Sequence, residues 1–160
     1  MTQPPAARHA DDSIAVHTTT VLPEDTNASG NLFGGHLVAL IDKTASITAS
    51  RHSRRNVVTA SIDRVDFLAP VRLGDILTVE ARLTYTGRTS MEIETVAWAE
   101  SRLTGARVQA CHSLLTFVAM DEQGNPTPVP GMSLRDDADR RRFEAGRARA
   151  DARRAARLGD

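Results

Sequence analysis

Hydrophobic and polar residues alternate in four segments of the second half of the chain, as they do in a β-strand with one buried face. In the clearest segment, residues 76–86, every second residue from Leu77 to Tyr85 is apolar. The other three segments are residues 57–67, 91–100 and 108–120. Turn-forming residues separate the segments, and short turns favour antiparallel pairing. The pattern therefore predicts an antiparallel meander of four strands.

The segment that contains Trp98 departs from strict alternation. It starts with Met91 and Ile93 on one face and ends with Val96 and Trp98 on the other. One extra residue in a strand turns the side chains that follow it to the opposite face. We therefore expect a β-bulge near Thr95.

Residues 36–50 have apolar side chains at a spacing near 3.6, which predicts an amphipathic helix. A glycine-rich loop over residues 27–35 precedes this helix. Before the loop, the β-branched residues of segment 14–22 predict a first strand. An apolar helix must be covered by other elements. The predicted fold class is therefore α+β, with an antiparallel sheet wrapped around one central helix.

The composition is typical of one compact domain, because the chain has 160 residues, of which 41% are hydrophobic and 25% charged. Its apolar stretches are interrupted well before the roughly 20 residues of a membrane-spanning helix. The first 13 residues lack the apolar core of a secretory signal. The 20 basic residues balance the 20 acidic ones. We therefore expect a cytoplasmic protein that binds neither nucleic acid nor a membrane.

The composition changes beyond residue 131. From Arg135 onward there are nine arginines, six acidic residues and almost no large apolar side chains. Such a segment buries little, which favours a solvated, partly helical tail. The alternative is an arm that binds phosphates or a partner. The expected organisation is a flexible segment over residues 1–13, one domain over 14–131 and an Arg-rich tail over 132–160.

One residue of the predicted helix breaks its apolar stripe. Asp42 directly follows Ile41, and a carboxylate among apolar side chains is poorly solvated, a condition found disproportionately at active sites. Just before the helix, Gly34 and Gly35 offer backbone N–H groups at the positive end of the helix dipole, where a carbonyl oxygen or an anion can bind. The structural alternatives are an Asp42 that is exposed or paired, with Lys43 of the same helix or with Arg64, and a plain glycine turn.

Several other chemistries are excluded because their motifs are absent. The sequence contains no G-x-S-x-G, no P-loop, no G-x-G-x-x-G and no H-E-x-x-H. Cys111 is the only cysteine, which rules out an internal disulfide and a multi-cysteine metal site. The histidines lack the spacing of metal ligands, so we expect no metal. His36 is the least certain of them, because it lies at the start of the predicted helix.

Three motifs in a fixed order resemble a known family. They are T-N-A-S-G-N-L-F-G-G at residues 26–35, V-T-A-S-I-D-R-V-D-F-L-A-P-V at residues 58–71 and G-R-T-S-M at residues 87–91. Asp42 lies between the first two, and Gly74-Asp75 between the last two. The chain resembles the hotdog-fold acyl-CoA thioesterases of the bacterial YciA and mammalian brain acyl-CoA hydrolase type, over about residues 16–121. The hotdog fold is a sheet around a helix, as the pattern predicts.

The resemblance implies hydrolysis of an acyl-CoA to a free acid and CoA, in fatty acid metabolism and without a cofactor. Asn27 and Asp42 match the family's catalytic pair, contributed by opposite subunits. Asp42 is implied as general base or nucleophile, Asn27 as the group that orients water or substrate, and the Gly35 N–H as the oxyanion donor. The implied substrate-binding residues are Gly34, Thr59, Arg88 and Ser90. The implied assembly is at least a homodimer, and by default a homohexamer built as a trimer of dimers.

Two other functions are compatible with this fold. A non-catalytic protein that binds or senses acyl-CoA would retain the fold, but the presence of both Asn27 and Asp42 argues against it. A hotdog hydratase or dehydratase needs a histidine near the helix start, where His36 is the only candidate, and it would leave Asp42 idle. The acyl chain length depends on packing that the sequence does not reveal.

Overall fold

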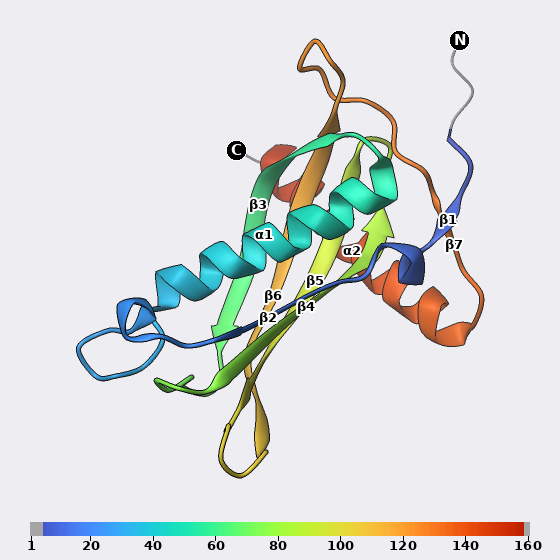
Figure 1. Ribbon diagram of the computed structural model, residues 1–160. Coiled ribbons are helices and arrows are strands. Elements are labelled where there is room, and N and C mark those ends of the chain that lie inside the picture. Colours follow the sequence, from blue (N-terminus) through green and yellow to red (C-terminus); the bar gives the residue numbers. More distant parts are fainter. Residues whose placement is uncertain (1–4, 159–160) are drawn as a thin grey trace.

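The computed structural model describes residues 5–158. In chain order its elements are β1 (Arg8–His9), η1 (Ala10–Ser13), β2 (Ala15–Thr20), η2 (Pro23–Asp25), α1 (Gly34–Ser53), β3 (Asn56–Phe67), β4 (Ile76–Thr86), β5 (Ser90–Glu100), β6 (Arg107–Met120), β7 (Met132–Ser133) and α2 (Asp137–Leu158). Five strands form one antiparallel sheet in the order β2-β4-β5-β6-β3, and α1 runs across one face of it (Figure 1).

The core lies between α1 and the sheet. Leu37, Ile41, Ala45 and Ala49 recur every fourth residue of α1, and each is at most 3% exposed. This spacing places them on one helical face, where they join the buried strand residues in a single apolar cluster. The predicted α+β fold, a sheet around a central helix, is confirmed. Within the described residues, no helix combines the length and the apolar character that crossing a membrane requires.

The predicted four-strand meander is wrong for β3. Strands β4, β5 and β6 do follow one another as antiparallel neighbours, but β3 pairs with β6 at the far edge of the sheet. The reason is that α1 carries the chain across the sheet to that edge, and the segment over residues 68–75 returns it to β4 (Figure 1). Turn residues after β3 signal where the strand ends, but not which strand it pairs with.

The expected bulge near Thr95 is also wrong. Alternation continues through β5, where Thr95 and Ala97 are buried and Val96 and Trp98 are partly buried on the opposite face. The register shift against β6 falls between Ala97 and Trp98. Apolar side chains are tolerated on this second face because they are covered: the Arg107 guanidinium lies 4.6 Å from the centre of the Trp98 ring.

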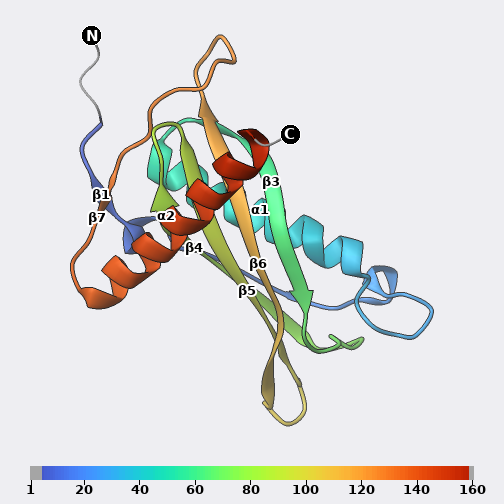
Figure 2. The same ribbon diagram turned by 180° about the vertical axis from the view of Figure 1, so that it is seen from behind.

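The Arg-rich segment packs against the sheet. Its helix α2 lies across the sheet face opposite α1 (Figure 2). Phe143 contacts Tyr85 with ring centroids 5.1 Å apart, and Gly146 is buried. The expectation of a solvated tail is therefore wrong for α2. Its contacts are largely ion pairs and a close backbone approach, which a count of large apolar residues does not detect.

The N-terminal segment is also attached to the domain. Strand β1 pairs in parallel with β7, and η1 packs against α1. The buried His9 ring lies with Nε2 2.7 Å from Oδ2 of Asp139, at the start of α2. The expected flexibility of residues 1–13 is wrong for residues 8–13, while residues 1–4 lie outside the described residues.

Candidate active site

The N-terminus of α1 has the geometry of an anion site. The helix follows Phe33, and no side chain caps it. Because the first N–H groups of a helix have no partner within it, those of Gly34 and Gly35 stay available at the positive end of the dipole. A β-carbon at Gly35 would lie 2.6 Å from Cε1 of Phe33. A side chain here would displace the exposed Phe33 ring, so glycine leaves the helix start open beside that ring.

Asp42 lies two helical turns further along α1 and is held by a residue of β3. The hydroxyl of Thr59 donates a hydrogen bond of 2.7 Å to Oδ1 of Asp42. Asp42 is partly buried, so the expectation of a poorly solvated carboxylate holds in part. The alternative pairing with Arg64 is wrong, because Arg64 pairs with Asp66 at 2.7 Å. The second carboxylate oxygen of Asp42 therefore remains available for chemistry.

Asn27 lies in the exposed loop before α1, and its side-chain orientation is fixed. Its Oδ1 accepts hydrogen bonds from the N–H groups of Ser29, at 3.0 Å, and Asn31, at 3.2 Å. Among residues 5–158, Asn27 and Asp42 of the same chain form no hydrogen bond with each other. With its oxygen engaged in the loop, Asn27 offers the two N–H donors of its amide group.

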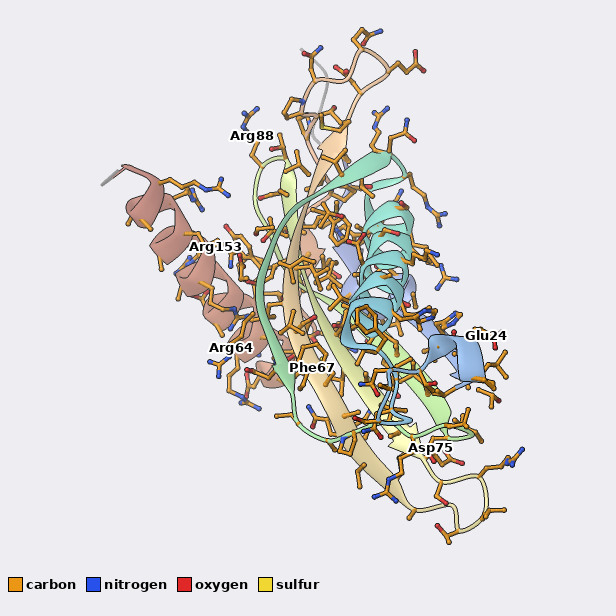
Figure 3. All side chains as sticks on the ribbon, turned by 90° about the vertical axis from the view of Figure 1, so that its left-hand side faces the viewer. Glu24, Arg64, Phe67, Asp75, Arg88 and Arg153 are labelled. Carbon is orange, nitrogen blue, oxygen red and sulfur yellow. The ribbon has the colours of Figure 1, made fainter. Side chains whose placement is uncertain are left out.

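An apolar cavity of about 260 Å³ adjoins the glycine pair. Its lining residues include Gly34, Leu32, Leu37, Phe67 and Leu68. Figure 3 shows Phe67 at the end of β3, on the strand nearest the viewer. The cavity is thus a space for an apolar group within reach of the free helix N-terminus.

The surface along β3 exposes many large apolar side chains. β3 is an edge strand of 12 residues whose outer side pairs with no strand in the described part of the chain. Its neighbourhood exposes large apolar side chains to between 37% and 58%, namely Phe33, Ile47, Val58, Ile62, Phe67 and Leu68. Long edge strands and large apolar patches are normally covered by a partner.

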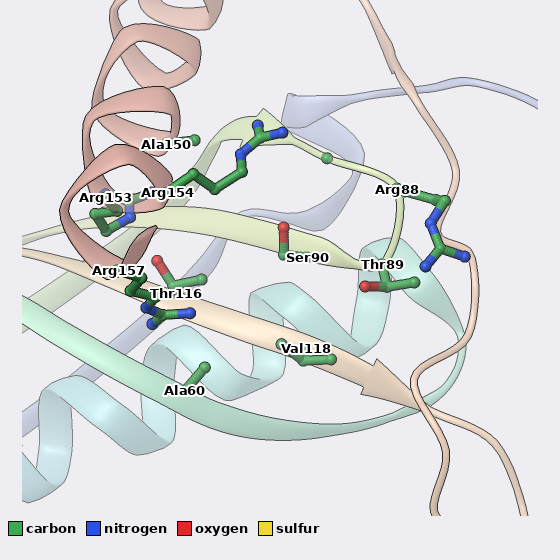
Figure 4. A pocket seen from close by; sticks show the side chains of 11 residues that line it. Ala60, Arg88, Thr89, Ser90, Thr116, Val118, Ala150, Arg153, Arg154 and Arg157 are labelled. Carbon is green, nitrogen blue, oxygen red and sulfur yellow. The ribbon is translucent and has the colours of Figure 1, made fainter. Parts of the chain in front are cut away.

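Arg88 and Ser90 lie on the other side of the sheet from Asp42. They line a second cavity of about 260 Å³ between α2 and the sheet (Figure 4). Alternation along β3 explains the separation, since Thr59 points to α1 whereas Ala60 lines this cavity. These sequence-predicted residues therefore form two groups. Arg88 and Ser90 lie beside α2, and the group beside α1 consists of Gly34, Gly35, Asp42 and Thr59.

Comparison with known proteins agrees with this geometry. Residues 29–106 match the sequence profile of the thioesterase superfamily. A Bacillus subtilis protein, the uncharacterized acyl-CoA thioester hydrolase YkhA, is 47% identical over 79% of this chain and 73% of its own length. The chain belongs to the thioesterase superfamily. As the sequence predicted, this thioesterase is an acyl-CoA thioester hydrolase.

Two solved structures resemble the thioesterase along nearly its whole length. An apo-hexameric acyl-CoA thioesterase superposes with a TM-score of 0.90 and 41% identity, covering 95% of this chain and 97% of the other. The second is an acyl-CoA hydrolase from Staphylococcus aureus in complex with butyryl coenzyme A, coenzyme A and coenzyme A disulfide. It superposes with a TM-score of 0.87 and 38% identity, covering 96% of this chain and 93% of the other. The predicted hotdog fold and hydrolase class are confirmed.

Sequence reasoning missed a buried carboxylate in this thioesterase. Glu92 has no exposed side-chain surface and accepts hydrogen bonds from Arg149 at 2.6 Å, Thr84 at 2.8 Å and Arg153 at 3.1 Å. Burial alone raises the pKa of Glu92, but the donors, Arg149 foremost, outweigh it and hold that pKa below its usual value. A signal was present, because Arg149, Arg153 and Arg157 are spaced by four and share one helical face.

Two further reactive side chains of the thioesterase are His36 and Cys111. His36 lies with Nε2 3.5 Å from Oδ1 of Asp25 at the helix start. Cys111 is buried, and burial raises the pKa of its thiol to about 11, so it is not a nucleophile at neutral pH. Within the described residues, no three His, Cys, Asp or Glu side chains form a group able to hold a metal ion.

Proposed function

We propose that Asp42, Asn27 and the Gly35 N–H hydrolyse the acyl-CoA thioester in a site shared by two subunits. The observation that carries this proposal is the hydrogen bond from Thr59 to Asp42, which fixes a partly buried carboxylate on the same helix as the uncapped glycine start. Solved variants of the Staphylococcus aureus hydrolase replace one Asn, one Asp and one Thr by Ala. Those positions are 15 and 17 residues apart, the intervals that separate Asn27, Asp42 and Thr59 here.

Each group supplies one part of the reaction. Asp42 accepts a proton from water as the water oxygen attacks the thioester carbonyl carbon. The electron pair moves to the carbonyl oxygen, which accepts a hydrogen bond from the Gly35 N–H. The amide N–H groups of Asn27 orient the water or the carbonyl. When the carbonyl re-forms, the C–S bond breaks and CoA leaves as a thiolate, which needs no strong general acid.

The alternative role of Asp42 is covalent. Its carboxylate would attack the carbonyl carbon, expel the thiolate and form a mixed anhydride, which water then cleaves. A single turnover in ¹⁸O-labelled water separates the two roles. General-base catalysis leaves no label in the enzyme. Label in the enzyme, with unlabelled Asp42 oxygen in the product, identifies the covalent route in which water attacks the Asp42 carbonyl of the anhydride.

The assembly is proposed from the exposed surface around the site. Covering the edge of β3 and its apolar neighbours requires a second copy, and the free amide of Asn27 would then face Asp42 of the partner subunit. Relatives described as hexameric, including a thioesterase from Yersinia pestis, support a homohexamer built as a trimer of dimers. A rat relative named cytosolic acyl coenzyme A thioester hydrolase, of which this chain matches 34%, supports a cytoplasmic location.

The substrate contacts follow from the two cavities. The apolar cavity beside Gly34 takes the acyl group, next to the proposed oxyanion donor. Thr59 positions Asp42 against the carbonyl. Arg88 and Ser90 bind the CoA portion on the other face of the sheet.

Replacement of the carboxylate tests the chemistry. Asp42→Asn keeps the side-chain volume but can neither accept the proton nor attack, so kcat should fall by about 10²- to 10⁴-fold with folding and assembly unchanged. Asp137→Asn, an exposed position paired with Arg140, is the matched control and should keep full activity. An Asp42→Asn enzyme with wild-type kcat would refute the assignment.

Mixed oligomers test the shared site. We expect Asn27→Ala and Asp42→Ala proteins each to be inactive. When equal amounts are refolded together, half of the dimers are mixed, and each mixed dimer has one site with both native residues. Activity should therefore return to about a quarter of the wild-type value. No recovery in mixed dimers verified by mass spectrometry would mean that one chain supplies both residues.

A further inference from the structure

The cavity under α2 is strongly basic, and the family resemblance does not account for its helix side. Four arginines line it, Arg88 from the loop before β5 and Arg153, Arg154 and Arg157 from α2. Figure 4 shows Arg153, Arg154 and Arg157 at the α2 side of the cavity and Arg88 at its other end, beyond Ser90 and Thr89. The α2 residues lie beyond residues 29–106, which match the superfamily profile. No carboxylate is among the lining residues of the described chain.

The four arginines are not equally available for a ligand. Arg153 is held by two carboxylates, Asp63 at 2.7 Å and the buried Glu92 at 3.1 Å, so its charge is balanced and it anchors the helix. Arg154 pairs with Asp151 at 3.1 Å, on an exposed surface where such pairs are weak.

Two arginines are left with their charge uncompensated. Within residues 5–158, Arg88 and Arg157 form no ion pair with a carboxylate. Two or three guanidinium groups can therefore turn to an anion in this cavity without breaking a buried contact.

Hydroxyl groups complete the cavity. Thr89, Ser90 and Thr116 all line it, and Oγ1 of Thr116 is buried without a hydrogen-bond partner in the described structure. A buried polar atom without a partner is costly, and a bound ligand or water removes that cost. A β-carbon at Gly87 would lie 2.8 Å from Oγ of Ser90, so glycine leaves room for this hydroxyl. Arginines with hydroxyl donors and no acid are the usual composition of a phosphate site.

We propose that this cavity binds the phosphate groups of the acyl-CoA substrate, with Arg154 and Arg157 of α2 acting together with Arg88 and Ser90. The inference rests on the proposed function and extends its CoA site to a helix outside the matched region. CoA carries a diphosphate and a separate 3′-phosphate, which suits several arginines spread around one cavity. The cavity and Asp42 of one chain lie on opposite faces of the sheet, and the proposed partner covers the β3 edge between them. The phosphates bound here therefore belong to a substrate that reacts in the site of another subunit.

Kinetics with and without the phosphates test the proposal. The variants are Arg157→Ala and the double variant with Arg154→Ala, assayed on an acyl-CoA and on the matching acyl-pantetheine, which has no phosphate. We expect KM for the acyl-CoA to rise about five- to tenfold per arginine, with kcat unchanged. This factor corresponds to a contact whose strength lies between that of an exposed ion pair and that of a charge-assisted hydrogen bond. The KM for the acyl-pantetheine should not change. Arg147→Ala, on the same helix and paired with Glu144, is the matched control.

The outcomes separate this inference from the proposed function. Unchanged KM for the acyl-CoA in active variants overturns the phosphate site and leaves the hydrolase mechanism intact. Equal losses on both substrates overturn it as well, because they indicate a structural role of the arginines. A wild-type enzyme that hydrolyses neither substrate overturns both.

Adenosine 3′,5′-bisphosphate distinguishes the substrate's phosphates from those of an independent effector. If the cavity holds the CoA phosphates, this probe competes with the acyl-CoA, and its inhibition constant rises in Arg157→Ala by the same factor as KM. Inhibition that is not competitive with the acyl-CoA overturns the proposal. Raising the salt concentration should weaken the difference between wild type and variant, since these charges are exposed.

Discussion

Replacing Gly146 by Ala should destabilise the protein, although the same change stabilises most helices. Ala is favoured over Gly by about 1 kcal/mol at an exposed helix position. Gly146 is buried in the middle of α2, where the helix approaches the sheet most closely. A β-carbon there would lie 2.5 Å from Cβ of Tyr85 and 3.1 Å from Oε1 of Glu92. The packing cost therefore opposes the helix propensity.

The size of the packing cost follows from what can move. Cβ of Tyr85 is bonded directly to the backbone of β4, which is paired there with β5, so no rotamer change relieves the contact. Carbon atoms pack at about 3.5–4.0 Å, so α2 must shift outward by about 1 Å. Overpacking of this kind costs about 1–3 kcal/mol. The shift also lengthens the 2.6 Å contact of Arg149 with the buried Glu92, which adds about 1 kcal/mol.

After the gain in propensity is subtracted, Gly146→Ala should lower the free energy of unfolding by about 1–3 kcal/mol. Urea denaturation at one fixed protein concentration measures this change, because the stability of an oligomer depends on concentration. The control is Ala148→Gly, an exposed position of α2, which reports propensity alone and should cost about 1 kcal/mol. A Gly146→Ala protein more stable than wild type would show that α2 does not lie this close to the sheet.

Three further predictions concern α2 and the site. Arg149→Ala leaves the buried Glu92 carboxylate with fewer hydrogen-bond donors. The free energy of unfolding measured by urea denaturation should therefore fall by about 2–3 kcal/mol. Pairing holds the pKa of Glu92 in the folded protein below its value in the unfolded chain, about 4.3. The stabilisation by this pair is therefore complete above about pH 4.3 and is lost as the pH falls through the lower pKa of the folded protein. The free energy of unfolding of Arg149→Ala should therefore depend less on pH than that of the wild type. Thr59→Val should lower kcat about tenfold, the effect of one lost hydrogen bond, and Thr59→Ser should restore it; equal kcat in both variants would contradict the positioning role. Truncation after Met132 exposes Tyr85 and Glu92, so the melting temperature should fall; an unchanged value would mean that α2 contributes nothing.

The sequence was most informative where a periodic pattern coincides with one buried face. The helix expected over residues 36–50 is α1, and the strand expected over 76–86 is β4, because each buries one face against the same core. The place of β3 was not predictable in this way. Apolar residues on both sides of β3 are exposed in the single chain, and the edge position depends on where α1 delivers the chain.

The candidate site was predictable only as far as local chemistry reveals it. Gly35 and Asp42 were visible as exceptions to a pattern, a glycine at a helix start and a carboxylate in an apolar stripe. The partner of Asp42 was not, because Thr59 is 17 residues away on a strand whose pairing was misjudged. Glu92 was missed because it shares a face of its strand with Glu94, and two acidic residues on one face suggest an exposed surface. The burial of Glu92 becomes apparent only when α2 covers it.

Strand β3 links Asp42, the proposed catalytic carboxylate, to the helix on the far side of the sheet. Successive residues of β3 face different structures, since Thr59 binds Asp42 on α1 and Ala60 lines the cavity under α2. Two register shifts against β6, between Thr59 and Ser61 and between Ile62 and Arg64, interrupt the pairing that would otherwise fix this segment. The ion pair from Arg153 to Asp63 supplies a second attachment there, and Arg153 is itself held by the buried Glu92. This contact of α2 therefore acts on the strand that positions Asp42, so substitution of Arg153 can change kcat without touching the substrate.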